Sequence, residues 1–318
     1  MNTFMIKKKT ALTVTLNPTL DHFVKVDDFK AGKDNELKEQ FYRAGGKGIN
    51  VSHVLKILKI DNVATGFLGG VTGEYLERSL NNKKIFSDFV HIKGQTRTNL
   101  TMIDQKRNLL TRIIDCGPLV SKKEIALIFA KIRILLLNCE YVVFSGRHMR
   151  GAPYDIYEKL ILLAKRYHKK TLLDTSGEFL LRGIKARPYL IKPNLPEAEY
   201  LFQEKLNTFT KIKKAIKELL ARGIPNVIIS LDQRGAVATN GEEFWWAHLP
   251  EKRIANSVGC GDAFIAGLLY SLIHGQSFKE ALRMAVATAT AYGLLSGKEL
   301  PSPGNIFRLV GRVKLLPI

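Results

Sequence analysis

The residues best suited to chemistry lie between positions 256 and 275. Gly259–Gly261 predicts a tight turn, and Asp262 then opens an apolar helix that Gly275 closes with a left-handed cap. The amino end of a helix presents unpaired N–H groups and a positive dipole, which favour an anion. A carboxylate beside a phosphate is expected where it does chemistry, so Asp262 is a candidate general base for phosphoryl transfer. The alternative is that Asp262 is an ordinary helix N-cap.

Three other positions carry candidate ligand-binding groups. The turn Gly45-Gly46-Lys47-Gly48 runs into a predicted helix, where glycines let backbone amides approach a ligand and Asn50 adds a side-chain amide. Asp21 follows a predicted strand and is a candidate to bind sugar hydroxyls. Arg97 begins a predicted hairpin and is a candidate for bidentate phosphate binding. The structural alternatives are a plain glycine turn, a turn-stabilising aspartate and a solvated arginine.

The elements around these residues predict an α/β fold with a mostly parallel central sheet. From residue 124 onward, helical and strand-like segments alternate, which is typical of a parallel sheet. Residues 96–114 predict a β-hairpin, which with residues 23–41 forms a small sheet outside the main domain. Polar residues that end successive strands favour a binding cleft at one sheet edge. They are Ser145, Asp174, Asn194 and Ser230.

Composition excludes several classes of protein. The 318 residues are 46% hydrophobic and 25% charged, which is typical of a globular chain of one large domain or two smaller ones. The three cysteines are scattered, as expected for reduced thiols in the cytoplasm. No apolar run is long enough to span a membrane. The net charge of +20 favours anionic partners, but the basic residues form no arm or aromatic stripe, so we predict phosphorylated metabolites rather than nucleic acid.

Several motifs in order cover nearly the whole chain, and as a set they are highly specific. The resemblance rests on Thr15–Asp21, Gly45–Asn50, Thr96-Arg97, Ser145-Gly146, Lys192–Glu197, Ser230-Leu231 with Gly235, and Val258–Asp262. Together they resemble the ribokinase/phosphofructokinase B sugar-kinase family. The Leu-Asn-Pro-x-Leu-Asp opening and the Gly-Gly-Lys-Gly-Ile-Asn loop are most similar to its 1-phosphofructokinase and tagatose-6-phosphate kinase branch.

This resemblance implies a role for each candidate residue. Asp262 matches the catalytic base, and Gly259, Cys260 and Gly261 match the anion hole for the transferred phosphoryl group. The implied sugar-phosphate site comprises Asp21, Lys33, Gly45, Gly46, Asn50, Arg97 and Ser145. The implied nucleotide site comprises Lys192, Asn194, Ser230 and Gly235. Glu197 would position Mg²⁺ through water with help from Asp174, and the metal would be held mainly by the phosphates of ATP.

The resemblance also implies the fold and the reaction. We expect a ribokinase-like three-layer fold, with residues 1–318 as a single kinase domain and a β-sheet lid formed by about 22–43 and 96–114. Such lids often pair two subunits, so a homodimer is expected. The leading prediction is ATP- and Mg²⁺-dependent conversion of fructose 1-phosphate to fructose 1,6-bisphosphate. The alternatives are a tagatose-6-phosphate kinase, a 6-phosphofructokinase, a catalytically silent sugar-phosphate sensor and a basic nucleic-acid-binding protein.

Three positions depart from the family pattern. After Ser145-Gly146 the family has a small residue, an apolar residue and proline, whereas this chain has four residues beginning and ending with arginine, Arg147 to Arg150. These cations border the predicted sugar site and are candidates for a further phosphate contact. Asp232 replaces a glycine over the nucleotide site. Cys260 replaces an alanine at a helix N-terminus, where a lowered thiol pKa would make it oxidisable.

Overall fold

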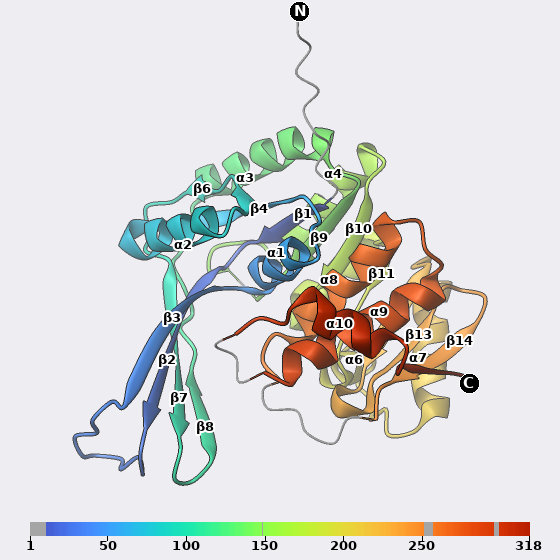
Figure 1. Cartoon of the computed structure of the whole chain (residues 1–318). Helices are drawn as coiled ribbons and strands as arrows, with labels where there is room; N and C mark the ends of the chain where they lie inside the picture. The colour runs from blue at the N-terminus through green and yellow to red at the C-terminus, as the bar shows by residue number, and fades with distance from the viewer. Residues whose placement is uncertain (1–10, 148, 251–256, 296–298) are drawn as a thin grey trace, which may run out of the picture.

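A large mixed sheet forms the middle of the molecule (Figure 1). The computed structural model describes residues 11–147, 149–250, 257–295 and 299–318. All strands from β12 to β5 run parallel, and β13, β14 and β15 continue the sheet antiparallel. In spatial order the strands are β15 (Lys314–Pro317), β14 (Phe244–His248), β13 (Ala236–Thr239), β12 (Asn226–Ser230), β11 (Leu190–Ile191), β10 (Lys170–Asp174), β9 (Tyr141–Ser145), β1 (Ala11–Thr15), β4 (Asn62–Leu68) and β5 (Phe86–Ser87), with β6 (Val90–His91) also paired to β4.

The strands are apolar on both faces because helices cover both sides of the sheet. In β9, Val142 and Phe144 enter one hydrophobic core, while Tyr141 and Val143 enter the other. This double burial is the reason that parallel strands read as continuous apolar runs. The predicted three-layer α/β fold is confirmed.

The helices fall into two layers, one on each core. One layer contains α3 (Lys122–Leu135), α4 (Ile156–Arg166), α5 (Gly177–Gly183), α6 (Leu195–Phe202) and α7 (Phe209–Ala221). The other contains α1 (Lys47–Ile57), α8 (Cys260–Ile273), α9 (Phe278–Gly293) and α10 (Pro303–Val310). A smaller core joins α1 and β4 to α2 (Gly70–Asn82).

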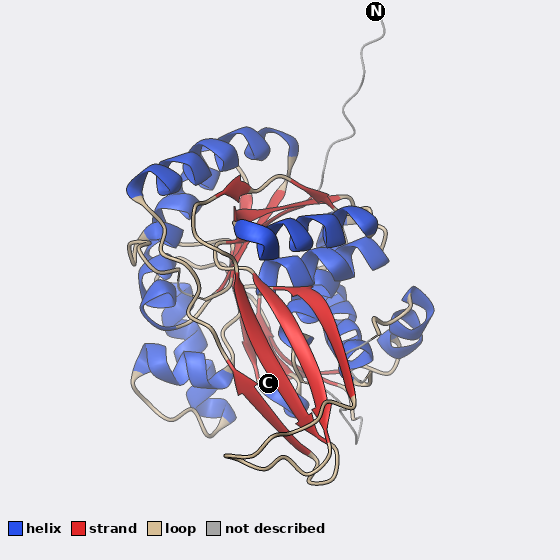
Figure 2. Ribbon diagram, turned by 90° about the vertical axis from the view of Figure 1, so that its left-hand side faces the viewer, coloured by secondary structure: helices blue, strands red, loops and turns tan. Residues whose placement is uncertain are grey.

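A second sheet projects from the main body on the side of β1 and α1 (Figures 1 and 2). Its strand order is β3 (Glu39–Gly45), β2 (Thr19–Val26), β7 (Arg97–Asp104) and β8 (Leu109–Ile113). The predicted small sheet is therefore present, with a tight turn between β7 and β8. Strand β2 begins at Thr19, four residues before the predicted segment, so Asp21 lies inside a strand.

The structure differs from the sequence prediction in three places. Helix α8 begins at Cys260 rather than Asp262, because the left-handed Gly259 already starts the helical turn. Helix α2 begins at Gly70 rather than at residue 73. The antiparallel strands β13–β15 were not predicted as part of the sheet. Residue 256 lies outside the described residues, within which no helix is long and apolar enough to cross a membrane.

Candidate active site

The polar strand ends meet at the carboxyl edge of the main sheet, as predicted. Ser145 is in register with Thr15 and Asp174, and Asn194 bridges to Ser230. A cavity of about 770 Å³ opens there, between this edge, the second sheet and the N-terminus of α8. The predicted site residues that line it are Asp21, Gly46, Asn50, Arg97, Asp174, Lys192, Asn194, Glu197, Ser230, Gly235, Gly259, Cys260, Gly261 and Asp262.

Asp262 lies in the first turn of α8, beside the predicted anion hole. The N-cap of this helix is Gly259, with φ +92°, a conformation that favours glycine. A Cβ there would also lie 2.9 Å from the Tyr292 ring. The Asp262 side chain makes no capping bond; its Oδ2 accepts a 2.8 Å hydrogen bond from Asn50 Nδ2. The alternative reading of Asp262 as an N-cap is therefore wrong, and its carboxylate faces the cavity.

The environment of Asp262 suits a general base. Burial raises the pKa of its carboxyl group, and the nearby Asp174 carboxylate raises it further, to about 7. Lys47, the Asn50 hydrogen bond and Lys192 oppose this rise. A base whose pKa lies near neutral pH can accept a proton during the reaction without being blocked at working pH.

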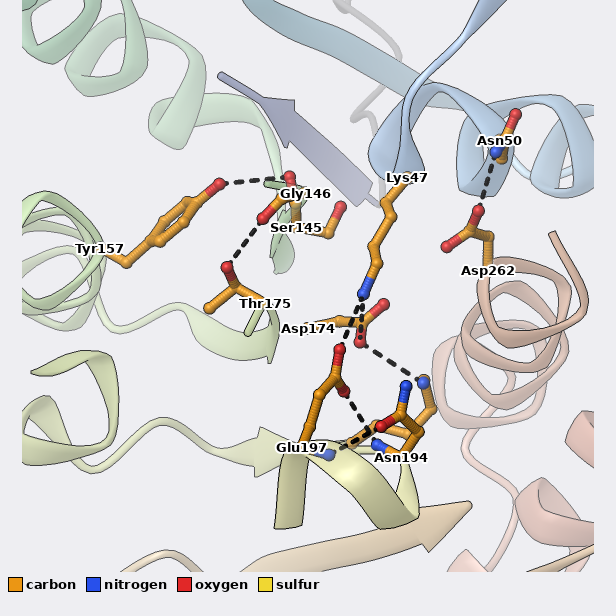
Figure 3. Close-up of polar contacts among 11 residues, drawn as sticks. Lys47, Asn50, Ser145, Gly146, Tyr157, Asp174, Thr175, Asn194, Glu197 and Asp262 are labelled. Carbon is orange, nitrogen blue, oxygen red and sulfur yellow. Dashed lines mark hydrogen bonds and ion pairs between the residues drawn. The ribbon is translucent and has the colours of Figure 1, made fainter. Parts of the chain in front are cut away.

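A partly buried ionic network lies below Asp262 in the view of Figure 3. Lys47 Nζ is 3.2 Å from Asp174 Oδ1 and 3.7 Å from Glu197 Oε1, and Lys192 Nζ is 3.4 Å from the same Asp174 oxygen. Burial raises the pKa of Asp174, but the two lysines outweigh it and hold the pKa below its usual value. Burial lowers the pKa of Lys47, and the two carboxylates outweigh that effect. Lys47 thus stays positively charged at the cavity wall.

Asn194 and Glu197 first have a structural task. Asn194 caps α6 by accepting a 2.8 Å hydrogen bond from the Glu197 N–H, and Glu197 Oε2 accepts 2.9 Å from the Asn194 N–H. This reciprocal capping box fixes both side chains at the cavity wall.

The carboxylates here also fit a hard cation. Asp174 Oδ2 is buried with no hydrogen-bond partner among the described residues, and Glu197 lines the cavity. Oxygen ligands of this kind are those that Mg²⁺ prefers. Within the described residues, no three acidic, histidine or cysteine side chains are grouped to hold a metal alone. Asp174 and Glu197 are therefore the residues of this cavity wall that fit such a cation.

The second sheet contributes the other end of the cavity. Asp21 Oδ1 accepts a 3.2 Å hydrogen bond from Asn99 Nδ2, and these residues are in register on β2 and β7. Burial raises the pKa of Asp21, against the lowering effect of the Arg43 charge. Arg97 lines the cavity but donates to the carbonyls of Asn17 at 3.0 Å, Pro18 at 3.3 Å and Asp115 at 2.9 Å.

Three predicted substrate residues lie outside the cavity lining. Lys33 is exposed on the loop between β2 and β3. Gly45 lies directly against the Asp21 side chain: a Cβ at position 45 would be only 2.2 Å from Asp21 Oδ2, so this position requires glycine. Ser145 is fully buried at the end of β9. The proposed reactivity of Cys260 is wrong: burial and the carboxylates of Asp262 and Asp232 raise the pKa of its thiol to about 11.

Sequence reasoning assigned no role to several residues that line the cavity, among them Asn17, Lys47, Asn99 and Arg112. Lys47 stands inside the glycine-rich motif, so its position carried a signal. Asn99 lies two residues after Arg97 on one strand, and alternation places both on the same face. No feature of the sequence around Arg112 indicated a binding role, because β8 reaches the cavity only through its pairing with β7.

A family model described as pfkB family carbohydrate kinase matches residues 14–302. The chain belongs to the pfkB family of carbohydrate kinases. This pfkB-family kinase is 33% identical over 306 residues to 1-phosphofructokinase of Bacillus subtilis, with 95% of the chain and 98% of that protein covered. It is 33% identical over 293 residues to a tagatose-6-phosphate kinase of Staphylococcus epidermidis, with 91% and 92% covered.

The fold of this pfkB-family kinase is similar to that of solved structures of phosphofructokinases. A crystal structure of a possible 1-phosphofructokinase from Thermotoga maritima matches with a TM-score of 0.88 and 29% identity, covering 97% of this chain and 99% of that one. The predicted class, a sugar-phosphate kinase, is confirmed by these relatives. The family implies ATP together with a metal ion.

Proposed function

We propose that this kinase transfers the γ-phosphoryl group of ATP to a hydroxyl of a ketohexose phosphate, with fructose 1-phosphate as the preferred substrate. The observation that carries the proposal is the placement of Asp262, with a pKa of about 7, in the first turn of α8. The carboxylate of Asp262 and the N-terminus of α8 thereby face one cavity, at the point where a hydroxyl would attack a phosphoryl group.

The charged and polar residues of the cavity would bind the nucleotide at one end and the sugar at the other. Lys192 and Lys47 offset the negative charge of the nucleotide phosphates, and the N–H groups at the start of α8 stabilise charge that develops on the moving phosphoryl group. Asn194, Ser230 and Gly235 line the nucleotide end. Asp21 and Asn50, at the other end, would orient the sugar hydroxyls.

Proton transfer falls to Asp262. Its Oδ1 makes no described hydrogen bond, whereas its Oδ2 is held by Asn50. The fixed carboxylate would accept the proton of the attacking hydroxyl as the new P–O bond forms and the bond between the γ-phosphorus and the bridging oxygen breaks, releasing ADP. Closure of the second sheet over the sugar would exclude water, so that the γ-phosphoryl group passes to the sugar hydroxyl and not to water.

The metal site is part of the proposal. Glu197 and Asp174 would hold Mg²⁺, through water and together with the ATP phosphates. Bound Mg²⁺ supplies positive charge that screens the phosphates from the attacking oxygen.

The decisive experiment measures ADP release with ATP and Mg²⁺. Fructose 1-phosphate, tagatose 6-phosphate and fructose 6-phosphate are compared at equal concentrations, for the wild type and Asp262→Asn. We expect the highest kcat/KM for fructose 1-phosphate and a loss of at least 100-fold in the variant, as for removal of a general base. Asp34→Asn, on the exposed loop before β3, is the matched control.

Each other outcome changes a different part of the proposal. A preference for a 6-phosphate keeps the mechanism and moves the substrate to that of a tagatose-6-phosphate kinase or a 6-phosphofructokinase. Binding of sugar phosphates without turnover would replace the enzyme with a catalytically silent sensor. Salt-sensitive binding of DNA would favour the nucleic-acid alternative.

We also propose that the protein is a homodimer formed through the second sheet and that it is cytoplasmic. Leu109, Leu110 and Ile113 of the edge strand β8 are exposed apolar residues, which is unusual for a surface that meets only water. None of the three cysteines forms a disulfide in the described chain, as expected in a reducing compartment. Light scattering of the wild type and of Leu110→Lys tests the dimer, which the charge should dissociate.

A further inference from the structure

Arg43 is a buried arginine that joins the second sheet to the main body. It lies near the end of β3, which leads into α1 where the two parts meet (Figure 1). Arg43 is 8% exposed, and its Nη1 donates a 3.2 Å hydrogen bond to Tyr292 Oη, near the end of α9 and 249 residues away in the chain. Its Cζ lies 5.1 Å from the centre of the Phe23 ring on β2. Because burying a guanidinium group is costly, this position calls for a function.

The Tyr292 end of this hydrogen bond lies against the turn that starts α8. A Cβ at Gly259 would be 2.9 Å from both Cε1 and Oη of Tyr292, so the tyrosine ring directly contacts this glycine. Gly259 is the N-cap of α8, and Asp262 follows in the first helical turn. Tyr292 is 4% exposed and belongs to the same hydrophobic core as α8. The ring therefore holds the turn that would face the transferred phosphoryl group.

The Arg43 end lies beside the residue proposed to orient the sugar. Arg43 on β3 and Asp21 on β2 are directly opposite each other, so their side chains share one face of the second sheet. Burial raises the pKa of Asp21, and the positive charge of Arg43 opposes that rise. A series of neighbours thus leads from the sugar end of the cavity, through Arg43 and Tyr292, to the turn at the start of α8.

We propose that Arg43 and Tyr292 are positioning residues for phosphoryl transfer. Their hydrogen bond sets the position of the second sheet, which would hold the sugar, relative to the Gly259 turn, which would hold the transferred group. This inference rests on the proposed function and adds two residues that are not among the described residues lining the cavity. Their effect on turnover must therefore pass through the groups that they hold. Such an effect is large, since a displacement of about 1 Å at the reacting atoms can cost about 100-fold in rate.

The first test is Tyr292→Phe, which removes the hydroxyl and keeps the ring against Gly259. Tyr141→Phe is the matched control: this tyrosine lies in the same core, donates to Leu272 O at 3.4 Å and does not line the cavity. ADP release at saturating substrates gives kcat, and calorimetry gives the Kd for fructose 1-phosphate and for ATP. We expect Tyr292→Phe to lower kcat by about tenfold and to leave each Kd within about twofold. Tyr141→Phe should leave kcat unchanged.

Arg43→Met completes a double-mutant cycle. This change also removes the charge opposite Asp21, so sugar binding should weaken as well, and the cycle isolates the contact with Tyr292. If the two residues act as a pair, Tyr292→Phe should change kcat by less than about twofold once Arg43 has been replaced. A tenfold loss in both backgrounds would overturn the link between them. An unchanged kcat in Tyr292→Phe, or a change in KM alone, would overturn the positioning role.

A second readout needs no turnover. Cys260 directly follows Gly259, so the rate at which iodoacetamide labels its thiol reports how firmly the turn is held. Tyr292→Ala should speed this labelling at least about fivefold relative to exposed Cys116 in the same molecule, whereas Tyr141→Ala, a cavity in the same core, should not. Equal labelling of wild type and Tyr292→Ala would refute the contact. If the wild type turned over no sugar phosphate, faster labelling would still support it, and the failure would belong to the proposed function.

Discussion

The pKa of the proposed base, Asp262, can be shifted through its hydrogen bond with Asn50. The amide donates to one carboxylate oxygen at 2.8 Å, and this contact favours the charged form of Asp262. In the wild type the carboxyl group is protonated and inactive below its pKa of about 7. We therefore expect kcat/KM to fall tenfold per pH unit below about 7 and to level off above it, since kcat/KM reports groups of the free enzyme.

Replacing Asn50 with alanine removes the donor and leaves the burial of Asp262 in place. A hydrogen bond to a charged group contributes about 1.5–3 kcal/mol, and one pKa unit corresponds to 1.36 kcal/mol. The midpoint of the pH profile should therefore move upward by about one to two units. Asn50 also lines the sugar end of the cavity, so the height of the profile should fall as well. The height and the midpoint are independent readouts.

The assay is the initial rate of ADP release from pH 5.5 to 9.5, at substrate concentrations well below KM. Asn99→Ala is the matched control, because its amide donates to Asp21 and not to Asp262. It should lower the rate without moving the midpoint. The substrate phosphate titrates near pH 6 in every sample, so it cannot cause a difference between variants. A wild-type profile that is flat across neutral pH, or equal midpoints for wild type and Asn50→Ala, would refute the assignment of Asp262 as the base.

Three other predictions follow from the same cavity. Lys47→Met should lower kcat by about 100-fold, because a cation beside the transferred phosphoryl group is lost; kinetics that show only a raised KM for ATP would contradict this. Asn194→Ala should lower the free energy of unfolding by about 1 kcal/mol in urea titrations, whereas Glu197→Gln keeps the capping box and should change mainly the Mg²⁺ concentration needed for activity. Iodoacetamide at pH 7.5 should label exposed Cys116 much faster than Cys260, as followed by mass spectrometry. Equal labelling of the two thiols would show that the pKa of the Cys260 thiol is not raised.

The sequence alone was enough to predict the class of fold and the position of Asp262 in the first turn of a helix that faces the cavity. Strand and helix periodicity are local properties, so the alternation after residue 124 predicted a parallel sheet with helices on both faces. Strands of such a sheet share one carboxyl edge, so the polar residues at their ends had to meet there. The glycine turn before Asp262 predicted an anion site for a similar reason, because helix N-termini have fixed chemistry.

The partners of each charged side chain were decided only by the tertiary structure. Asn50 and Asp262 are 212 residues apart in the chain, and Lys47 and Asp174 are 127 apart. No local pattern specifies such pairs, since they depend on how two helices and a strand pack. The same packing places the Arg97 guanidinium where it donates to backbone carbonyls, and it brings residues of both sheets to one cavity. Residue types and order thus determined which chemistry is available, and packing determined which atoms perform it.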